Sequence, residues 1–309
     1  MTRKQTVCQG PGRDVRRARS VVRVSVIIAG CGDLGIEAGL RFAAAGHRVV
    51  GLRRRADLVP EPVEGRSVDL RRDVPTIDQD VEVVVVALAA GSRQVEEYRA
   101  TYVDGLRNVL DGIAAAGVTP RVLVVSSTAV YDVEDGATVT EDTPAHGGTP
   151  TADVLLEAEA LLRERAPEAV LVRLSGIYGP GRERLVDQVR SGAARLAPTP
   201  DGSMLTNRVH RDVAAAAIVH LAALDTVPPV VLGTDDEPVR LDTVLRFLAT
   251  ELGLPEPPVR TEGDADRRAG GGEKRLSNAL LRSTGFTFAY PTYREGYRAV
   301  LAGEGTRHP

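Results

Sequence analysis

The chain has 309 residues, of which 43% are apolar and 26% charged, and its formal net charge is −3. This composition is typical of a globular protein with one large or two modest domains, and the near-neutral charge argues against a nucleic-acid-binding surface. The longest apolar runs fall far short of the roughly 18 residues that a membrane helix needs, so no membrane partner is expected.

The first 20 residues are basic and lack apolar periodicity. A basic start before an apolar stretch has the outline of a signal peptide, but Arg23 and Ser25 interrupt the apolar stretch. We therefore expect residues 1–20 to be a disordered extension, or the product of a start codon placed too far upstream. The two cysteines, Cys8 and Cys31, match no zinc spacing, which favours a cytoplasmic protein with reduced thiols.

A strand, a glycine-rich turn and a helix follow one another directly. Residues 21–29 form a β-branched apolar run typical of a strand buried on both faces, and residues 34–45 change to helical periodicity before a second strand at 47–52. Glycines in the intervening turn allow a close approach to a pyrophosphate, which the amides of a helix N-terminus attract. This framed motif predicts a dinucleotide site at Gly30, Gly32, Asp33, Leu34 and Gly35.

The end of the second predicted strand indicates which dinucleotide binds. In NAD-binding proteins an acidic residue about 20 positions beyond the first glycine bonds to the ribose 2′-hydroxyl. Here the strand ends in three arginines, and the first acidic residue after them is Asp57. The guanidinium groups of Arg53 and Arg54 suit a 2′-phosphate. The pattern favours NADP over NAD, with a solvated arginine-rich loop as the alternative.

Strand and helix patterns alternate through the following hundred or so residues. Short strands are predicted at 66–69, 81–87, 121–126 and 169–174, with a long helical pattern between residues 95 and 113. Such alternation is typical of an α/β fold with a Rossmann-type, doubly wound parallel sheet. After residue 175 the pattern loosens into helices, short strands and Gly/Pro-rich loops. We expect a Rossmann domain over 21–175 and a smaller substrate-binding lobe over 176–309, with some segments returning to the sheet.

Four motifs together resemble the extended short-chain dehydrogenase/reductase superfamily, in its NAD(P)-dependent epimerase/dehydratase type. Beside the glycine turn, they are VSSTAVY at 125–131, RLSGIYGPGR at 173–182 and NRVHRD at 207–212. The resemblance spans about residues 22–302. It implies cofactor contacts at Asp69, Leu70, Ala89, Ala90, Gly91 and Ser126. It also implies that Ser127 stands where this family keeps its catalytic serine or threonine.

The residues that carry proton chemistry in this family are replaced here. The family uses a tyrosine and, four positions later, a lysine that lowers the pKa of the phenol. Aligning the matching helix puts Thr151 and Leu155 at these positions. The two lysines of the chain are Lys4 and Lys274, and none of its tyrosines has a lysine four residues on. The chain therefore resembles the atypical branch of the superfamily, which lacks the dyad.

Three explanations of the missing dyad stay open. The protein can be an enzyme that uses other groups, the candidates being Ser127, Tyr131, Tyr178 and His210. It can be a reductase in which water or the substrate supplies the proton. It can also be a non-catalytic NADP-dependent redox sensor or scaffold. His210 opens a helical run, where capping explains it as well as catalysis does.

Other enzyme classes are disfavoured by the sequence. The five histidines have no metal-ligand spacing with each other or with the cysteines, and no G-x-S-x-G elbow is present for a serine hydrolase. The expected partner is a small molecule, a carbonyl compound or a sugar-nucleotide-like substrate. The resemblance further implies a homodimer formed through the helices after the fourth and fifth strands.

Overall fold

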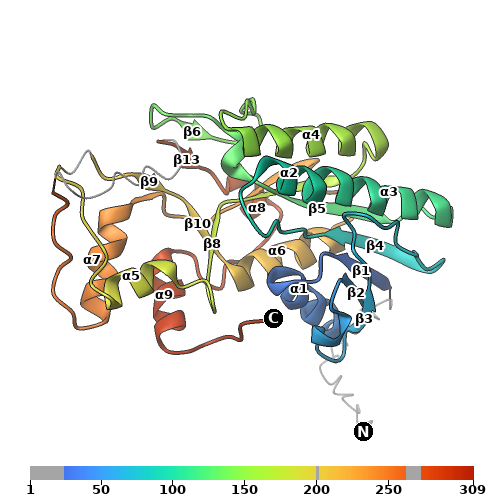
Figure 1. Cartoon of the computed structure of the whole chain (residues 1–309), viewed down its shortest axis with the longest axis horizontal. Coiled ribbons are helices and arrows are strands. Elements are labelled where there is room, and N and C mark those ends of the chain that lie inside the picture. Colours follow the sequence, from blue (N-terminus) through green and yellow to red (C-terminus); the bar gives the residue numbers. More distant parts are fainter. Residues whose placement is uncertain (1–23, 200–201, 262–272) are drawn as a thin grey trace, which may run out of the picture.

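The computed structural model describes residues 24–199, 202–261 and 273–309, and the predicted N-terminal extension lies outside these ranges. In the described part, seven parallel strands form one sheet in the order β11-β7-β5-β4-β1-β2-β3 (Figure 1). Their bounds are Ser25–Ala29 (β1), Arg48–Arg53 (β2), Glu64–Ser67 (β3), Val81–Val86 (β4), Arg121–Ser127 (β5), Val170–Leu174 (β7) and Val230–Gly233 (β11). The predicted α/β fold with a doubly wound parallel sheet is confirmed.

The central strands form because they are apolar on both faces. Ile27 of β1 pairs in register with Val50 of β2 and with Val84 of β4, and all three are fully buried. Strands covered on both faces read as continuous runs of β-branched residues, which is the pattern of β1 and β4.

Helices cover both faces of the sheet (Figure 1). On one face α1 (Asp33–Ala44) packs against α6 (Arg211–Ala223). On the other lie α4 (Pro150–Arg165) and a continuous helical stretch made of α2 (Val95–Tyr98), the π-helical turn η2 (Arg99–Asp104) and α3 (Gly105–Ala116). Each face has its own apolar core, and the sheet separates the two.

Short elements of the C-terminal part pack beside the carboxyl edge of the sheet (Figure 1). The paired strands are β8 (Gly176–Tyr178) with β10 (Arg208–His210), β9 (Leu205–Thr206) with β12 (Val239–Arg240), and β6 (Thr138–Val139) with β13 (Arg275–Leu276). The helices are α5 (Arg184–Arg190), α7 (Leu241–Glu251), α8 (Ala279–Ser283) and α9 (Tyr293–Leu301). A separate apolar cluster joins α5, α7 and α9. From the same part of the chain, α6 and β11 lie with the main sheet.

The third strand differs from its predicted position. It was expected at 66–69 and lies at Glu64–Ser67. The strand is at the edge of the sheet and its side chains are mostly exposed and polar, so no alternating apolar pattern marks it. Gly65 fixes its place, because a Cβ there would lie 2.4 Å from the carbonyl oxygen of Ala56.

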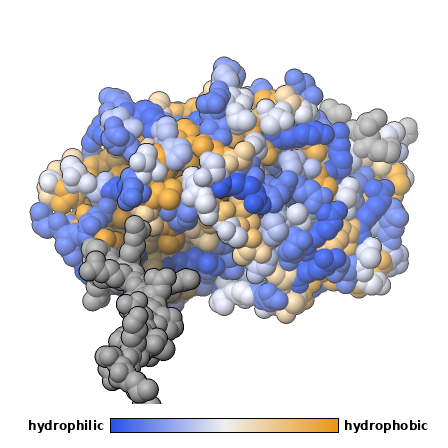
Figure 2. Space-filling view, turned by 180° about the vertical axis from the view of Figure 1, so that it is seen from behind, coloured by the Kyte–Doolittle hydropathy of each residue, from blue (hydrophilic) through white to orange (hydrophobic). Residues whose placement is uncertain are grey.

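The outer surface is mixed in character. Figure 2 shows hydrophilic residues interspersed with smaller apolar areas over the face that it presents. None of the helices in the described ranges is long and apolar enough to cross a bilayer.

Candidate functional site

The glycine turn between β1 and α1 lies at the carboxyl edge of the sheet. Gly30 has φ +88°, and a Cβ there would lie 2.6 Å from the carbonyl oxygen of Ala87. A Cβ on Gly35 would lie 2.6 Å from the carbonyl oxygen of Gly30. Packing therefore requires both glycines. A Cβ on Gly32, by contrast, would meet nothing within 4 Å, so this part of the turn faces open space.

The start of α1 is suited to an anion. Gly32 is the N-cap and has no side chain to accept a hydrogen bond from the first helical amides. The amides of Asp33, Leu34 and Gly35 stand at the positive end of a 12-residue helix. Together with the open face at Gly32, this geometry fits the pyrophosphate of a dinucleotide.

The carboxylate of Asp33 lies in the first turn of α1, where it is held by two arginines from the C-terminal half. Its Oδ2 accepts from Nε of Arg182 at 2.8 Å, and its Oδ1 accepts from the guanidinium of Arg211 at 2.6 Å. Arg211 has no exposed surface and also bonds to Asp212 at 2.6 Å. Asp33 therefore connects the glycine turn to α6 and to the loop after β8, and both its oxygens are used in doing so.

Two arginines stand at the end of β2. Arg53 is the last residue of the strand, and its guanidinium donates to the main-chain oxygen of Pro309 at 2.9 Å. Arg54 follows it and is exposed. Both cations lie at the strand end where the sequence predicts contacts to the ribose of the dinucleotide.

Asp69 and Leu70 lie just beyond β3. The guanidinium of Arg71 bonds to both oxygens of Asp69, at 2.9 and 2.8 Å, and this contact lowers the pKa of that carboxyl to about 2. Asp69 is therefore ionised at neutral pH. The side chain of Leu70 is 5% exposed and belongs to a core cluster, so only its backbone is available to a ligand.

The loop after β4 carries Ala89, Ala90 and Gly91. The amide of Ala90 lies 3.5 Å from the hydroxyl of Tyr102, and the amide of Gly91 lies 3.5 Å from Oε1 of Glu97. Both partners belong to the α2–η2 stretch. Long contacts of this kind hold the loop weakly, so these amides remain open to stronger acceptors.

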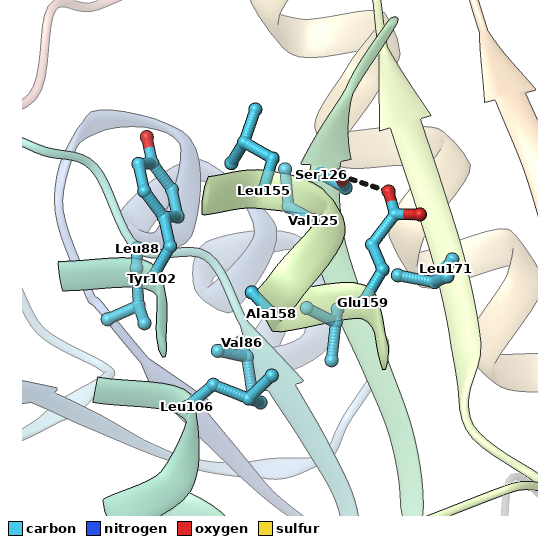
Figure 3. Close-up of a pocket in the computed structure, with 11 residues that line it drawn as sticks. Val86, Leu88, Tyr102, Leu106, Val125, Ser126, Leu155, Ala158, Glu159 and Leu171 are labelled. Atoms are coloured by element: carbon cyan, nitrogen blue, oxygen red, sulfur yellow. Dashed lines mark hydrogen bonds between the residues drawn. The ribbon is translucent and has the colours of Figure 1, made fainter. Parts of the chain in front are cut away.

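The two serines at the end of β5 have different surroundings. Successive side chains of a strand point to opposite faces. Ser126 donates its hydroxyl proton to Oε1 of Glu159 at 2.6 Å (Figure 3). The same carboxylate pairs with Arg173. The Ser127 oxygen instead accepts from the amide of Ala129 at 3.1 Å. Accepting this bond leaves the hydroxyl proton of Ser127 able to donate.

Leu155 lines a small cavity behind this strand. The cavity has a volume of about 20 Å³, enough for one water. Figure 3 shows Leu155 and Tyr102 on one side of it and Ser126 with Glu159 on the other. The Thr151 hydroxyl lies one turn earlier on α4, 3.3 Å from the hydroxyl of Thr149. The two positions aligned with the family's dyad thus carry an alcohol and an apolar wall.

The structure buries both tyrosines that the sequence analysis proposes as donors. The Tyr131 hydroxyl accepts from Arg173 at 2.6 Å, the side chain is 1% exposed, and burial raises its pKa. Tyr178 is 4% exposed and packs against Tyr297, with its hydroxyl against Gly296. Burial raises its pKa as well. Among the described residues the Tyr178 hydroxyl has no hydrogen-bond partner.

The capping interpretation of His210 is confirmed. Its Nδ1 accepts from the amide of Asp212 at 3.2 Å, at the start of α6. Burial lowers the pKa of the imidazole to about 4, so the ring is neutral at pH 7.

Lys274 supports the candidate site, although no motif in the sequence indicates it. It is 6% exposed, and its ammonium donates to the carbonyl oxygens of Thr128 and Tyr131, at 2.9 and 2.6 Å. These residues bound the 3-10 turn η3 (Thr128–Val130), which begins directly after Ser127. Lys274 therefore holds the turn that follows Ser127. The contacts span more than 140 residues of sequence, so no local pattern signals them.

Two further features bear on the chemistry. In the described ranges, no group of three or more His, Cys, Asp or Glu residues is placed to hold a metal ion. An open, polar depression of about 520 Å³ is lined by Glu134, Asp135, Gly136, Arg240, Glu273 and Arg275.

Residues 32–228 match a family model described as the NAD dependent epimerase/dehydratase family. The matched range contains the rest of the glycine turn from Gly32, both serines of β5, and Arg211.

Individual proteins are also similar to the chain. A solved structure from Methylobacillus flagellatus, provisionally assigned as an NAD-dependent epimerase/dehydratase, is 35% identical with a TM-score of 0.72, over 92% of this chain and 99% of that one. A Streptomyces 3-diazoavenalumate denitrifying reductase is 27% identical over 263 residues, or 75% of this chain and 83% of the reductase. MoeE5, solved with UDP-glucose and NAD, shares the fold at 22% identity and a TM-score of 0.73, over 90% of this chain and 97% of that one.

Proposed function

The chain belongs to the NAD dependent epimerase/dehydratase family, and we propose on that basis that it is an NAD(P)-dependent oxidoreductase acting on a small carbonyl or sugar-nucleotide-like molecule. The observation that carries the proposal is the glycine turn, with its open face at Gly32 and uncapped helix amides, at the same carboxyl edge of the sheet as a serine hydroxyl that can donate a hydrogen bond. The sugar-nucleotide class is supported by the nucleotide sugar bound to MoeE5, and a reductive reaction is supported by the reductase relative.

Named residues would hold the dinucleotide. The amides after Gly32 would bind the pyrophosphate, and Arg53 with Arg54 would bind a 2′-phosphate, so NADP is the proposed preference. Asp69 would lie toward the adenine, and the loop of Ala89, Ala90 and Gly91 toward the ribose and nicotinamide. When bound, the nicotinamide supplies or accepts a hydride. The chain's own task is then to orient the substrate and to move a proton.

We assign the orienting role to Ser127. Its hydroxyl accepts from the Ala129 amide and can donate to a substrate carbonyl oxygen at the edge of the sheet. Thr151 and Leu155 offer no group that titrates near neutral pH, so the dyad chemistry of the family is absent in this proposal. Tyr131 and Tyr178 receive less support as donors, because both hydroxyls are buried. Ser127 would then donate a hydrogen bond to the substrate oxygen, and the transferred proton would come from water, relayed through the Ser127 hydroxyl or directly, or from the substrate itself.

The substitution at the dyad positions also supports a second candidate function. A protein with an apolar Leu155 beside the nicotinamide position could bind NADP(H) and report its redox state without turnover. Such a sensor would distinguish the oxidised from the reduced nucleotide in affinity. We retain it as the alternative to catalysis.

The same proposal assigns a different binding role to each of two parts of the chain. Residues 21–175 would form the dinucleotide-binding domain and residues 176–309 the substrate-binding lobe. The polar depression is lined by residues of both parts, 134–136 from the first and Arg240, Glu273 and Arg275 from the second. A homodimer through the helices after β4 and β5 is proposed from the resemblance.

Turnover distinguishes the two functions. Purified protein would be mixed with NADPH or NADH and a panel of carbonyl compounds and sugar nucleotides, with nucleotide oxidation and product formation both followed. An enzyme gives product that the Ser127→Ala variant forms much more slowly at unchanged nucleotide affinity. Binding without any turnover, together with a strong preference for one redox form, would favour the sensor.

A further inference from the structure

The residues after α9 return to the glycine turn. From Leu301 the chain runs back beneath α9 and reaches the N-terminal end of α1 (Figure 1). The last four residues, 306–309, make hydrogen bonds with groups on both sides of that turn. We call residues 306–309 the strap.

Arg211 anchors the beginning of the strap. Its guanidinium donates to the carbonyl oxygen of Thr306 at 2.8 Å while also bonding to Asp33. Because Arg211 has no exposed surface, these bonds are shielded from water. The strap is thereby tied to the same buried cation that holds the first turn of α1.

His308 anchors the middle of the strap on α1 itself. Its amide donates to Oδ1 of Asp33 at 3.3 Å, and its Nε2 lies 2.9 Å from Oε2 of Glu37. The side chain is 8% exposed. The contact with His308, helped by the charges of Arg41 and Arg211, lowers the pKa of Glu37 to about 2, so this carboxylate stays ionised at neutral pH.

Arg307, between these two anchors, packs against the loop after β8. A Cβ on Gly181 would lie 2.2 Å from Cδ of Arg307, so the glycine leaves room for the strap. Gly181 precedes Arg182, the second arginine on Asp33. The strap is therefore seated between α1 and a loop that is itself fixed to α1.

Pro309 brings the strap to the ribose end of the proposed nucleotide site. Its main-chain oxygen accepts from the guanidinium of Arg53, across 256 residues of sequence. Arg53 is the cation assigned to the 2′-phosphate of NADP under the proposed function, on which this inference rests. We infer that the strap modulates cofactor specificity: the main-chain oxygen of Pro309 occupies Arg53 and competes with the 2′-phosphate of NADP.

The competition has a definite direction. NADP carries an anionic phosphate that needs the guanidinium, whereas NAD presents a neutral hydroxyl at the same place. Binding of NADP must therefore release Arg53 from Pro309. Breaking that hydrogen bond offsets part of the free energy gained when the 2′-phosphate binds Arg53. NAD binds without the exchange. The bound strap thus reduces the ratio of NADP affinity to NAD affinity.

The test compares NADPH and NADH affinities by calorimetry in the full chain and in a variant lacking residues 306–309. Removal of the strap is expected to tighten NADPH binding at least about fivefold, the lower end of typical couplings between sites, and to change NADH binding less than twofold. His308→Ala, which loosens the strap without shortening the chain, should give a smaller shift of the same sign. Thr306→Ala is the matched control, because it keeps the carbonyl that Arg211 uses.

The same deletion in an Arg53→Ala protein tests the contact between Arg53 and Pro309 by itself. In the Arg53→Ala protein, removal of residues 306–309 should no longer change NADPH affinity, because the contested group is gone. Thermal unfolding of each variant confirms that it is folded. The inference is overturned if strap removal leaves NADPH binding unchanged or weaker, or if it changes the binding of both nucleotides equally. Normal NADH binding in that case leaves the proposed function standing. Failure of the full chain to bind either nucleotide would overturn both.

Discussion

Arg211, a residue with no exposed surface, donates to Oδ1 of Asp33 at 2.6 Å across 178 positions of sequence. The same guanidinium bonds to Asp212 and to the carbonyl oxygen of Thr306. One buried cation therefore joins the first turn of α1, the first turn of α6 and the strap. This arrangement fixes the glycine turn relative to the C-terminal half, so the stability of the fold and the geometry of the proposed nucleotide site depend on the same side chain.

Replacement of Arg211 by methionine is expected to destabilise the fold by about 3–5 kcal/mol, because it leaves carboxylates without their buried partner. Chemical denaturation measures this change. Arg107→Met is the matched control: its pair with Asp104 is exposed and three residues apart, and such pairs contribute about 0.5 kcal/mol or less. Equal losses in the two variants would contradict the structural role of Arg211.

Arg53→Glu should separate the two nucleotides. The charged hydrogen bonds lost with a 2′-phosphate correspond to about 1.5–3 kcal/mol each, so NADPH affinity should fall about 10- to 100-fold. NADH affinity should stay the same or rise, because the new carboxylate can accept a hydrogen bond from the ribose 2′-hydroxyl. Arg55→Glu, two residues beyond the strand end, makes the same charge change and serves as the control. An Arg53→Glu protein that binds NADPH normally would remove the argument for NADP.

The two serines of β5 should respond differently to removal of their hydroxyls. Ser126→Ala removes one donor to Glu159, which keeps its pair with Arg173, and should cost about 1 kcal/mol of stability at unchanged nucleotide affinity. Ser127→Ala should leave stability nearly unchanged and slow turnover by about 100-fold or more, as expected for loss of a positioned donor. Denaturation and steady-state kinetics on both variants check this. Slow turnover in Ser126→Ala with lost stability in Ser127→Ala would contradict the assignment of the chemistry to Ser127.

Asp235 gives the stability a pH dependence of known sign. Burial raises the pKa of its carboxyl from 3.8 to about 7. The folded protein therefore keeps a proton that the unfolded chain has lost, and this contribution to stability disappears as pH rises from about 4 through 7. Asp235→Asn cannot lose that proton. The variant should gain stability relative to the parent between pH 5 and pH 8, as measured by denaturation at both values; a constant difference would contradict the buried environment.

Much of the sheet could be predicted from the sequence because its information is local. The apolar runs of β1 and β4 and the glycines at 30, 32 and 35 each carry a pattern within a few residues. The edge strand β3 was misplaced because its exposed polar side chains carry no such pattern.

The contacts that complete the candidate site join residues that are far apart in the sequence. Lys274 reaches Thr128 across 146 positions, and His308 reaches Glu37 across 271. Each depends on the packing of the whole chain and not on a neighbouring motif. Burial of Tyr131 and Tyr178 likewise follows from tertiary contacts, which explains why both looked available as donors in the sequence.

The central claim is that the glycine turn binds a nicotinamide dinucleotide, and calorimetric titration with NADPH and NADH tests it most directly. Gly32→Trp fills the open face of the turn, where an added side chain meets no neighbouring atom within 4 Å of its Cβ, while Ala114→Trp adds the same indole to an exposed position of α3. We expect saturable binding to the parent and to Ala114→Trp, and none to a folded Gly32→Trp protein. Absence of binding to the parent, or equal binding to both tryptophan variants, would contradict the claim.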